Sequence, residues 1–319
     1  MLLIKAESES EFKSWDEIVM SSSNGSIFQT TVWLRAFGEE LNLFYYLRGE
    51  KIVFGFLFII SKKYKVRGSF IPPYTPVYAP FHDLDLANSS ELNLYRSLVR
   101  ELSSRLNYKI LDHICYSSKV DLLSFKWNSH FIRPSVTYQL EGKKYDLSSI
   151  HQSKRRYVKK LQKLLDCGEL KLIENAEIAK IISLQEELSS IKKFNSNLRI
   201  LKSICSNEEL QNNFLAMAIA DKDDNYLSCC WVPYDNFRAY HILNISSNHE
   251  DSLLDKANFL LTFIVVSKVL ESGRTMDFEG SSIPGVEEFY RHMGGLQELR
   301  YRMTKVDVPL LKVLFRLLS

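Results

Sequence analysis

The chain has 319 residues, 45% of them apolar and 25% charged, and 41 Lys and Arg against 38 Asp and Glu give a net charge of +3. This composition excludes a disordered chain, and the length fits one large or two medium-sized domains that can each bury a core. The net charge is too small to indicate nucleic-acid binding by itself. Aromatic residues make up 12% of the chain, which favours a β-rich component.

The cysteine pattern indicates neither a disulfide framework nor a zinc site. The five cysteines have no C-x-x-C spacing, and the adjacent Cys229 and Cys230 point to opposite faces of a predicted strand. We therefore expect no bound metal and a reducing compartment. No signal peptide is visible, and the longest apolar runs, 52–60 and 259–266, are far shorter than the ~20 residues that span a bilayer. These features predict a cytoplasmic protein.

In the first half of the chain, periodicity predicts helices that alternate with runs of strands. The predicted helices are 10–20, 32–41 and 92–106, and the predicted strands are 2–5, 43–48, 52–61, 109–115 and 135–140. Between them, Phe70–Phe81 carries four prolines, which exclude a helix or a central strand. We expect an ordered, extended connection there.

The second half repeats this alternation. The predicted helices are 147–166, 177–192, 198–205, 252–271, 285–293 and 310–318, and the predicted strands are 214–220, 226–232, 238–245, 275–279 and 297–305. Ser252 and Asp255 resemble a capping box at the start of the fourth of these helices. Two similar domains, residues 1–145 and 146–319, are the natural expectation.

One segment carries a family resemblance. Residues 277–295, DFEGSSIPGVEEFYRHMGG, resemble the motif DFEGS-x-I-x-G-x-E-x-F-x-R-x-F-G-[AG] of FemAB-like proteins in the GNAT superfamily of acyltransferases, which includes cellulose-biosynthesis-type acetyltransferase domains. FQTTVWL at 28–34 and SKRRYVKK at 153–160 are similar to two further elements of that family. The three pieces lie far apart, so the resemblance spans most of the chain.

The resemblance implies an α+β fold of two tandem GNAT-like domains, with mixed, mostly antiparallel sheets flanked by helices. It also implies transfer of an acyl or aminoacyl group to an amine, from acyl-CoA or aminoacyl-tRNA. The acceptors in the family include cell-envelope precursors and nucleotide-linked amino sugars. Members that use aminoacyl-tRNA carry a long helical arm, for which 177–205 is too short. Acyl-CoA, such as acetyl-CoA, is therefore the favoured co-substrate, and tRNA is disfavoured.

The resemblance places the donor pyrophosphate near residues 248–256, NHEDSLLDK. Ser252 and Lys256 are the candidate cofactor-binding residues in this loop. The R-x-x-G-x-[GA] loop that holds the CoA pyrophosphate in ordinary GNAT enzymes is missing here. Decay of that loop would also fit a non-catalytic binding protein that holds a nucleotide sugar or a partner.

Two carboxylates are the candidate catalytic residues. Alternation along a strand puts Asp277 and Glu279 on one face and Met276 and Phe278 on the other. An ammonium acceptor must lose a proton before it attacks an acyl group, and a buried carboxylate can act as the base. Alternatively, both carboxylates hold backbone N–H groups or Arg291 and fix a turn.

Other candidates are assigned to substrate binding. Helical spacing puts Arg155 and Lys159 on one stripe of a basic helix suited to phosphate groups, although a solvated face is the plain alternative. The remaining candidates are Tyr74 and Tyr78 in the proline-rich connection, Tyr240 and His241 on a strand, and Tyr290 and Arg291 in the motif. Each could instead serve structure, a strand histidine as a satisfied core group.

The expected partner is therefore a small-molecule, lipid-linked or nucleotide-linked acceptor, and not DNA. The last predicted helix, 310–318, is apolar apart from Lys312 and Arg316. Such a basic amphipathic end could lie on anionic lipid, but at this length it more simply docks on its own domain. Membrane contact is thus expected to be peripheral at most.

Overall fold

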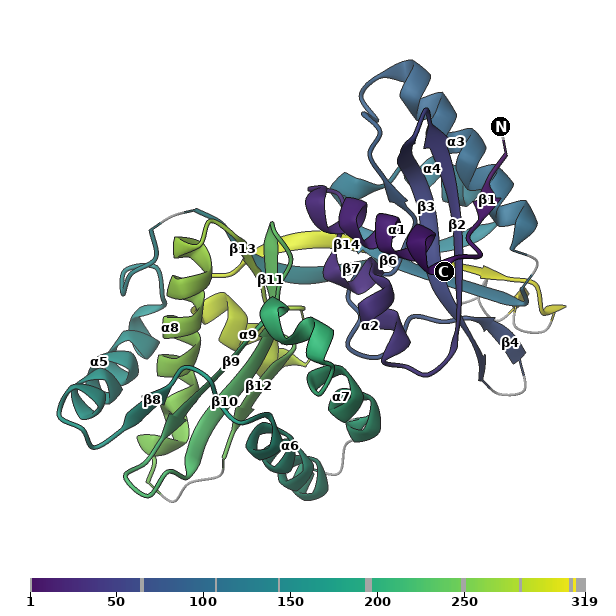
Figure 1. Ribbon diagram of the computed structural model, residues 1–319. Coiled ribbons are helices and arrows are strands. Elements are labelled where there is room, and N and C mark those ends of the chain that lie inside the picture. Colours follow the sequence, from purple (N-terminus) through teal and green to yellow (C-terminus); the bar gives the residue numbers. More distant parts are fainter. Residues whose placement is uncertain are drawn as a thin grey trace. The chain divides into compact units, whose positions relative to one another are not determined.

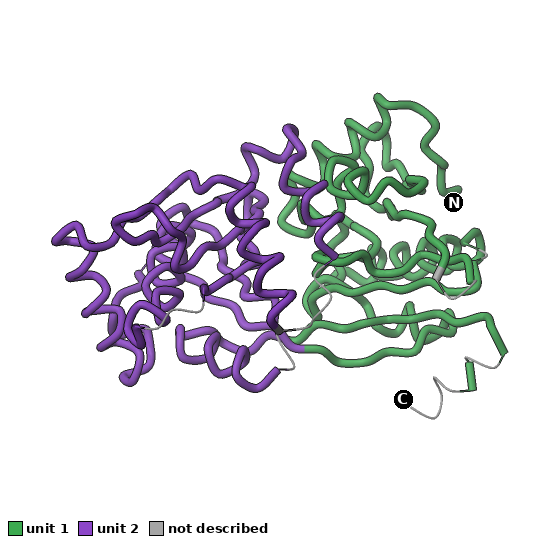
Figure 2. Tube along the Cα trace, turned by 90° about the horizontal axis from the view of Figure 1, so that it is seen from below, with its two compact units in different colours: residues 1–135, 299–319 green, residues 136–298 purple. Residues whose placement is uncertain are grey.

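A computed structural model of the chain describes residues 2–63, 66–106, 108–142, 144–192, 197–247, 251–280, 283–309 and 312–313 (Figure 1). The chain forms two compact units, unit 1 with residues 1–135 and 299–319 and unit 2 with residues 136–298 (Figure 2). It leaves unit 1 within strand β7 (His130–Leu140) and returns within β14 (Leu296–Val306). This division differs from the single boundary predicted near residue 145, because β14 brings the end of the chain back to unit 1.

Unit 1 is built on a mostly antiparallel sheet. Its strands follow the order β1-β2-β3-β4-β6-β14, and β5 pairs with β3. These strands are β1 (Ile4–Lys5), β2 (Glu40–Arg48), β3 (Lys51–Lys63), β4 (Val66–Ser69), β5 (Phe81–His82) and β6 (Ile110–Tyr116). The helices are α1 (Glu9–Ser21), α2 (Thr31–Arg35), α3 (Ser89–Arg105) and α4 (Leu122–Trp127), with short 3₁₀ turns η1 (Ile27–Gln29) and η2 (Ser117–Lys119). The pair β4 and β6 is parallel, and α3 forms the crossover between these two strands.

Large aromatic side chains fill the core of unit 1. Alternate residues of β3 are the phenylalanines 54, 56 and 58, and all three are fully buried. Trp15 of α1 and Trp33 of α2 are also fully buried, and the indole of Trp33 donates to the hydroxyl of Thr75. The resulting contact fixes the proline-rich connection, which forms no helix or regular strand before β5, as predicted.

Unit 2 contains two groups of strands. The group β12-β10-β9-β8 is antiparallel, whereas β7 pairs antiparallel with β13, which pairs parallel with β11. These strands are β8 (Lys171–Ile173), β9 (Phe214–Ala220), β10 (Tyr226–Pro233), β11 (Arg238–Tyr240), β12 (Leu243–Ser246) and β13 (Thr275–Asp277). The helices are α5 (Gln152–Asp166), α6 (Ile178–Lys192), α7 (Leu198–Cys205), α8 (Ala257–Glu271) and α9 (Pro284–His292), with 3₁₀ turns η3 (Glu208–Asn213) and η4 (Leu254–Lys256).

Helix α8 is the centre of the core of unit 2. It packs along strands β9, β10 and β12, and the basic helix α5 packs against it in turn (Figure 1). Leu260, Leu261 and Val265 of α8 are fully buried with Leu161 of α5. Because α8 is apolar almost all round, its side chains can face both the sheet and α5, and this fixes where its N-terminus lies.

The structure differs from the sequence-based prediction at several places. The predicted strand 238–245 is two strands, interrupted at His241 and Ile242. Helix α8 begins at Ala257 rather than 252, and Asp251, not Ser252, accepts the backbone N–H groups of that turn. The strand 275–279 ends at Asp277. Helix α4 was not predicted at all, and the predicted helix 310–318 lies almost entirely outside the described residues.

Candidate active site

The break between β11 and β12 is the first feature of the candidate site. Before the break, β11 pairs with β13, and after it β12 pairs with β10, so one stretch of chain passes from one group of strands to the other. The two peptide N–H groups at the break are already donated, that of His241 to the carbonyl of Asp277 (2.8 Å) and that of Ile242 to the carbonyl of Tyr240 (2.9 Å). The break is therefore a fixed part of the backbone.

His241 is the unusual side chain at this break. It is 2% exposed, and neither ring nitrogen has a hydrogen-bond partner among the described residues. Its ring lies edge-on to those of Phe278 and Tyr290, with centroids 5.7 and 6.5 Å away. Burial lowers the pKa of His241 to about 4, so the imidazole is neutral at pH 7, with one N–H to donate and one lone pair to offer.

Asp277 is committed to the turn that follows β13. Its carboxylate is fully buried and accepts from the hydroxyl of Thr137 (2.5 Å), the side-chain amide of Gln139 (2.7 Å) and the backbone N–H of Glu279 (2.7 Å). These contacts favour the structural alternative for Asp277. The sequence signal that could have revealed them is the alternation in β7, which puts Thr137 and Gln139 on one face of the strand.

Glu279 lies in the turn itself rather than on the strand. It has φ of 67°, and Gly280 follows with φ of 66°. A Cβ on Gly280 would lie 2.1 Å from the carbonyl oxygen of Val136, so only glycine fits. The two-residue alternation that placed Asp277 and Glu279 on one face therefore does not reach Glu279. Its charge nevertheless lies close enough to Tyr290 to help burial raise the pKa of that phenol.

A polar pocket of about 450 Å³ lies at the N-terminus of α8. It is lined by residues from α5, from the end of β12 and from the start of α8, namely Lys154, Tyr157, Ser246, Ser247, Asp255, Lys256, Asn258 and Phe259. The aromatic part of the wall is ordered, because Tyr157 stacks on Phe259 (6.1 Å, 15°) and the ammonium of Lys154 lies 5.0 Å above the Phe259 ring.

The charges in the pocket suit an anion. Lys154 and Lys256 bring two cations, and Asp255, the one carboxylate among the described lining residues, forms an ion pair with Lys256. No side chain forms a capping hydrogen bond at the start of α8, which follows directly on the 3₁₀ turn η4, and the positive end of the helix dipole adds to the two ammonium groups. Two ammonium groups at a helix N-terminus are a typical setting for phosphate groups.

Of the predicted cofactor-binding residues, Lys256 lines this pocket and Ser252 does not. Of the predicted cations of α5, Lys159 is exposed and does not line the pocket, whereas Arg155 is half-buried and binds backbone carbonyls just before the helix. The guanidinium of Arg155 donates to the carbonyls of Ile150 (2.8 Å) and Ser148 (2.9 Å). Lys154, the neighbour of Arg155 in the same motif, lines the pocket instead, although it is not among the predicted site residues.

The predicted tyrosines and Arg291 have mixed settings. The hydroxyl of Tyr240 is buried and donates to Asp235 (2.8 Å). Tyr290 stacks on Phe278 (5.0 Å, 18°), and Arg291 forms an ion pair with Glu287 one turn earlier. The hydroxyl of Tyr240 therefore serves the fold, whereas the ring of Tyr290 lies next to that of His241.

Tyr74 and Tyr78 belong to unit 1. Tyr74 is half-buried with φ of 57°. Tyr78 is 1% exposed, and its hydroxyl lies 2.7 Å from that of Ser69 and accepts the N–H of Ile59 (3.0 Å). A hydroxyl used in this way inside the core gives no support to the prediction that Tyr78 binds an acceptor.

Two further properties bear on the type of site. Among the residues that the structure describes, no three His, Cys, Asp or Glu side chains are grouped so as to hold a metal ion. Every described helix is too short or too polar to cross a bilayer.

Comparison with solved structures gives the fold. The crystal structure of FemX aligns over 98% of this chain and 100% of its own, with a TM-score of 0.75 and 13% sequence identity. The chain shares its fold with FemX. A tandem GNAT protein from the clavulanic acid biosynthesis pathway aligns over 97% of this chain and 98% of its own (TM-score 0.54, 11% identity), and so does L-PGS from Bacillus licheniformis, over 97% and 96% (TM-score 0.56, 10% identity).

The likeness to FemX and to a tandem GNAT protein confirms the predicted α+β architecture of tandem GNAT type, with a mostly antiparallel sheet flanked by helices. No family model and no curated protein matches the chain.

Proposed function

We propose that the protein is an N-acyltransferase that moves an acyl group from acyl-CoA to an amine, with the donor bound in unit 2. The observation that carries the proposal is the pocket at the N-terminus of α8, which is lined by Lys154 and Lys256 and where no side chain caps the helix. The fold shared with FemX and a tandem GNAT protein supports the reaction class, and the pocket supports a donor that carries a pyrophosphate.

The pocket and the strand break are connected by β12. Ser246 lines the pocket and ends β12, and His241 precedes β12 by two residues. At ~3.3 Å per residue the five steps between them span ~16 Å. We assign the pyrophosphate to the pocket and the reacting carbonyl to the break, with the extended arm of the donor along β12.

His241 and Glu279 are the groups that we assign to the reaction. The neutral imidazole donates its N–H to the carbonyl oxygen of the donor, on which negative charge develops as the amine attacks. Glu279 takes the proton from the acceptor ammonium before the attack. The C–S bond of the donor then breaks, and the CoA thiolate leaves with the second proton of the amine nitrogen. Asp277 is a positioning residue, because it holds the backbone N–H of Glu279 in the turn. The two backbone N–H groups at the break are not assigned to the carbonyl oxygen of the donor, because both already donate within unit 2.

The donor test is thermal unfolding of the full chain with CoA, acetyl-CoA, longer acyl-CoAs and pantetheine, which lacks the pyrophosphate. A ligand at 100 times its dissociation constant adds about 2.7 kcal/mol to the free energy of unfolding and raises the melting temperature by several degrees. We expect a shift with the CoA compounds and none with pantetheine. Equal shifts would remove the pyrophosphate pocket from the proposal, and no shift with any CoA would remove the donor.

The chemistry is tested separately, once an acceptor amine has been found among UDP-linked amino sugars and envelope precursors. Glu279→Gln should lower kcat by 100-fold or more while the dissociation constant of CoA stays unchanged. Asp277→Asn should lower stability as well, because one oxygen would lose its acceptor role. Full activity of Glu279→Gln would overturn the assignment of the base.

One observation favours a second candidate, transfer from aminoacyl-tRNA. Helix α5 carries exposed cations that form no ion pair with a described residue, namely Arg156, Lys159, Lys160 and Lys163. A row of unpaired cations suits a polyanion. Against it stand the short helices α6 and α7, where tRNA-dependent members of the family carry a long arm. Binding of aminoacyl-tRNA without binding of CoA would decide for this candidate.

A further inference from the structure

Helix α4 of unit 1 exposes two large apolar side chains that nothing in the proposed reaction uses. Trp127 is 59% exposed and Leu123 is 44% exposed, one helical turn apart. The other three tryptophans of the chain, Trp15, Trp33 and Trp231, are 0% exposed. A tryptophan left in water beside another exposed apolar residue is the kind of surface feature that marks an interaction site.

Cations surround this pair. Lys126 lies between Leu123 and Trp127 on the exposed side of α4, and the guanidinium of Arg96 in α3 lies 4.9 Å from the Trp127 ring. Arg100 follows Arg96 by one helical turn and is exposed on α3. We call these five residues, Arg96, Arg100, Leu123, Lys126 and Trp127, the α4 surface.

The charge of the α4 surface is positive. Asp121, at the N-cap of α4, is neutralised by Arg96 (2.8 Å). Neither Arg100 nor Lys126 forms an ion pair with a described residue. The α4 surface therefore carries two cations, Arg100 and Lys126, that form no ion pair with a described residue, and they favour a negatively charged partner.

We propose that the α4 surface docks on an anionic lipid bilayer, with Trp127 and Leu123 in the headgroup region and the cations at the lipid phosphates. An indole with an apolar body and a free N–H suits this boundary, and Lys and Arg beside it add attraction to anionic lipid. A stable protein–protein interface buries over ~1,000 Å², more than one six-residue helix presents, so a bilayer fits the size of the surface better.

The docking goes beyond the proposed transferase function and does not depend on it. Since no described helix can cross a bilayer, the contact is peripheral and reversible. It also differs from the membrane contact considered for residues 310–318, because the α4 surface lies in another segment of the chain.

The test uses the full chain and vesicles of phosphatidylcholine, with or without phosphatidylglycerol. Binding is measured by co-sedimentation, and insertion by the blue shift of tryptophan emission and by loss of acrylamide quenching. Because Trp127 is the one exposed tryptophan of four, a spectral change reports on α4. We expect binding to the mixed vesicles, a blue shift, and weakening at high salt.

The variants separate the two components of docking. Trp127→Ala should weaken binding by about ten-fold or more, because the indole supplies most of the apolar area. Lys126→Glu and Arg100→Glu should each weaken it by about five-fold or more on the anionic vesicles. The matched controls are Leu296→Ala, which removes an exposed apolar residue of unit 2, and Lys13→Glu, which makes the same charge change on α1. Both controls should bind like the parent.

Three outcomes overturn the proposal. The first is no binding to anionic vesicles. The second is binding that Trp127→Ala leaves unchanged while circular dichroism shows the variant folded. The third is a blue shift that follows protein concentration without lipid, which would make the α4 surface an interface between two copies. None of these results bears on whether CoA binds to unit 2, so the two proposals fail separately.

Discussion

Each unit contains a parallel pair of strands joined by a crossover helix, and the two helices begin in opposite ways. In unit 1 the helix is α3, between β4 and β6, and in unit 2 it is α8, between β11 and β13. The N-terminus of a helix leaves backbone N–H groups without partners and carries a partial positive charge. In unit 1 a side chain caps the helix, whereas in unit 2 no side chain caps α8, and a carbonyl of the preceding 3₁₀ turn accepts the N–H of Ala257 instead.

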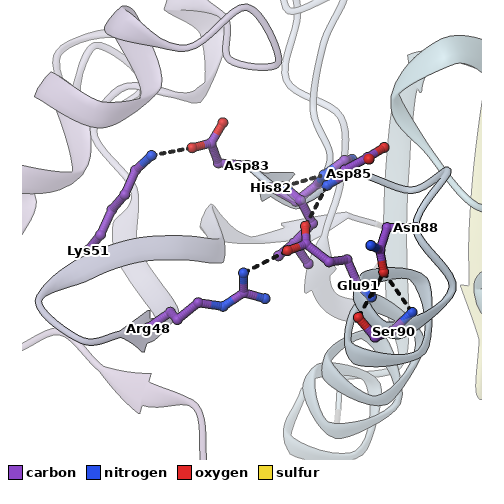
Figure 3. A network of polar contacts seen from close by, with 9 residues as sticks. Arg48, Lys51, His82, Asp83, Asp85, Asn88, Ser90 and Glu91 are labelled. Atoms are coloured by element: carbon purple, nitrogen blue, oxygen red, sulfur yellow. Dashed lines mark hydrogen bonds and ion pairs between the residues drawn. The ribbon is translucent and has the colours of Figure 1, made fainter.

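The start of α3 is filled by side chains of unit 1 (Figure 3). Asn88 caps the helix by accepting the N–H groups of Ser90 (2.9 Å) and Glu91 (3.3 Å). Glu91 in turn accepts from Arg48 (2.7 Å) and from the backbone N–H of Asp85 (2.7 Å), and these bonds lower the pKa of its carboxyl. An anion supplied by the chain therefore occupies the position that a ligand would take.

The strands before the two helices differ in the same sense. Ser69, the last residue of β4, is buried with its hydroxyl 2.7 Å from that of Tyr78. His241, directly after β11, is as deeply buried but has no partner on either ring nitrogen among the described residues. In unit 1, side chains of the chain therefore bind both the helix start and the polar group at the end of the preceding strand. In unit 2, no side chain caps α8, and the ring nitrogens of His241 have no hydrogen-bond partner among the described residues. This contrast is the structural reason to place the donor in unit 2.

The largest expected effect comes from closing the open helix end by charge. Lys154→Glu would put a carboxylate beside the uncapped start of α8, as Glu91 stands at α3, and would repel a pyrophosphate. Loss of a charge-assisted contact together with the new repulsion should weaken the binding free energy of CoA by ~3 kcal/mol. Calorimetry should then show a dissociation constant that is about 100-fold higher.

Lys163→Glu is the matched control for that change. It makes the same change of charge on the same helix, at an exposed position that does not line the pocket. Affinity for CoA should change by no more than a few-fold. If both variants lost affinity equally, the pocket would have no special role, and the general charge of α5 would explain binding.

The next effect concerns His241 and the pH dependence of stability. Its folded-state pKa of about 4 lies below the unfolded value of about 6.5, so the unfolded chain binds the proton more readily. The free energy of unfolding is therefore unaffected by His241 above pH 6.5. It falls as the pH falls from 6.5 towards 4, by roughly 3 kcal/mol in all. His241→Phe should flatten the curve of unfolding free energy against pH in this window.

Other histidines also change the free energy of unfolding with pH, so their effect must be separated from that of His241. Burial also lowers the pKa of His130 in unit 1 to about 4, so the parent and His241→Phe must be compared as a difference at each pH. Urea unfolding between pH 7 and pH 4 would give that difference. A pH profile that did not change on substitution would mean that His241 already has a partner for its proton.

Much of the difference between the two units could not be predicted from the sequence. Periodicity predicted α7 and β9 at their observed bounds, because it depends on the alternation of apolar residues within one element. The break at His241 depends instead on which strands each half pairs with, and sequence periodicity continues through it. The family motif pointed to Asp277 and Glu279 but did not reveal that Thr137 and Gln139 hold Asp277.

The pocket was predicted in part for a similar reason. The family resemblance predicts the donor at the loop before α8, and Lys256 of that loop lines the pocket. In the basic helix, Lys154 and Arg155 stand side by side in the sequence, but the packing of α5 on α8 directs Lys154 to the pocket and Arg155 to the carbonyls of Ser148 and Ile150. Which face of a helix meets its neighbour is decided by tertiary packing, so the choice between adjacent cations could not be made from spacing.

The smallest expected effect tests both helix ends with the same substitution. Asn88→Ala removes the cap of α3 and should lower the free energy of unfolding by about 1 kcal/mol, without changing the affinity for CoA. Lys256→Ala, at the N-cap position of α8, removes no capping bond and only a surface ion pair, so stability should change by less than ~0.5 kcal/mol. Affinity for CoA should fall about ten-fold, since one phosphate contact is lost.

Thermal unfolding and CoA titration of both variants give the four values. The contrast between the units would be contradicted if Lys256→Ala destabilised the protein as much as Asn88→Ala does and left CoA binding intact, because α8 would then depend on its own N-cap in the way that α3 does.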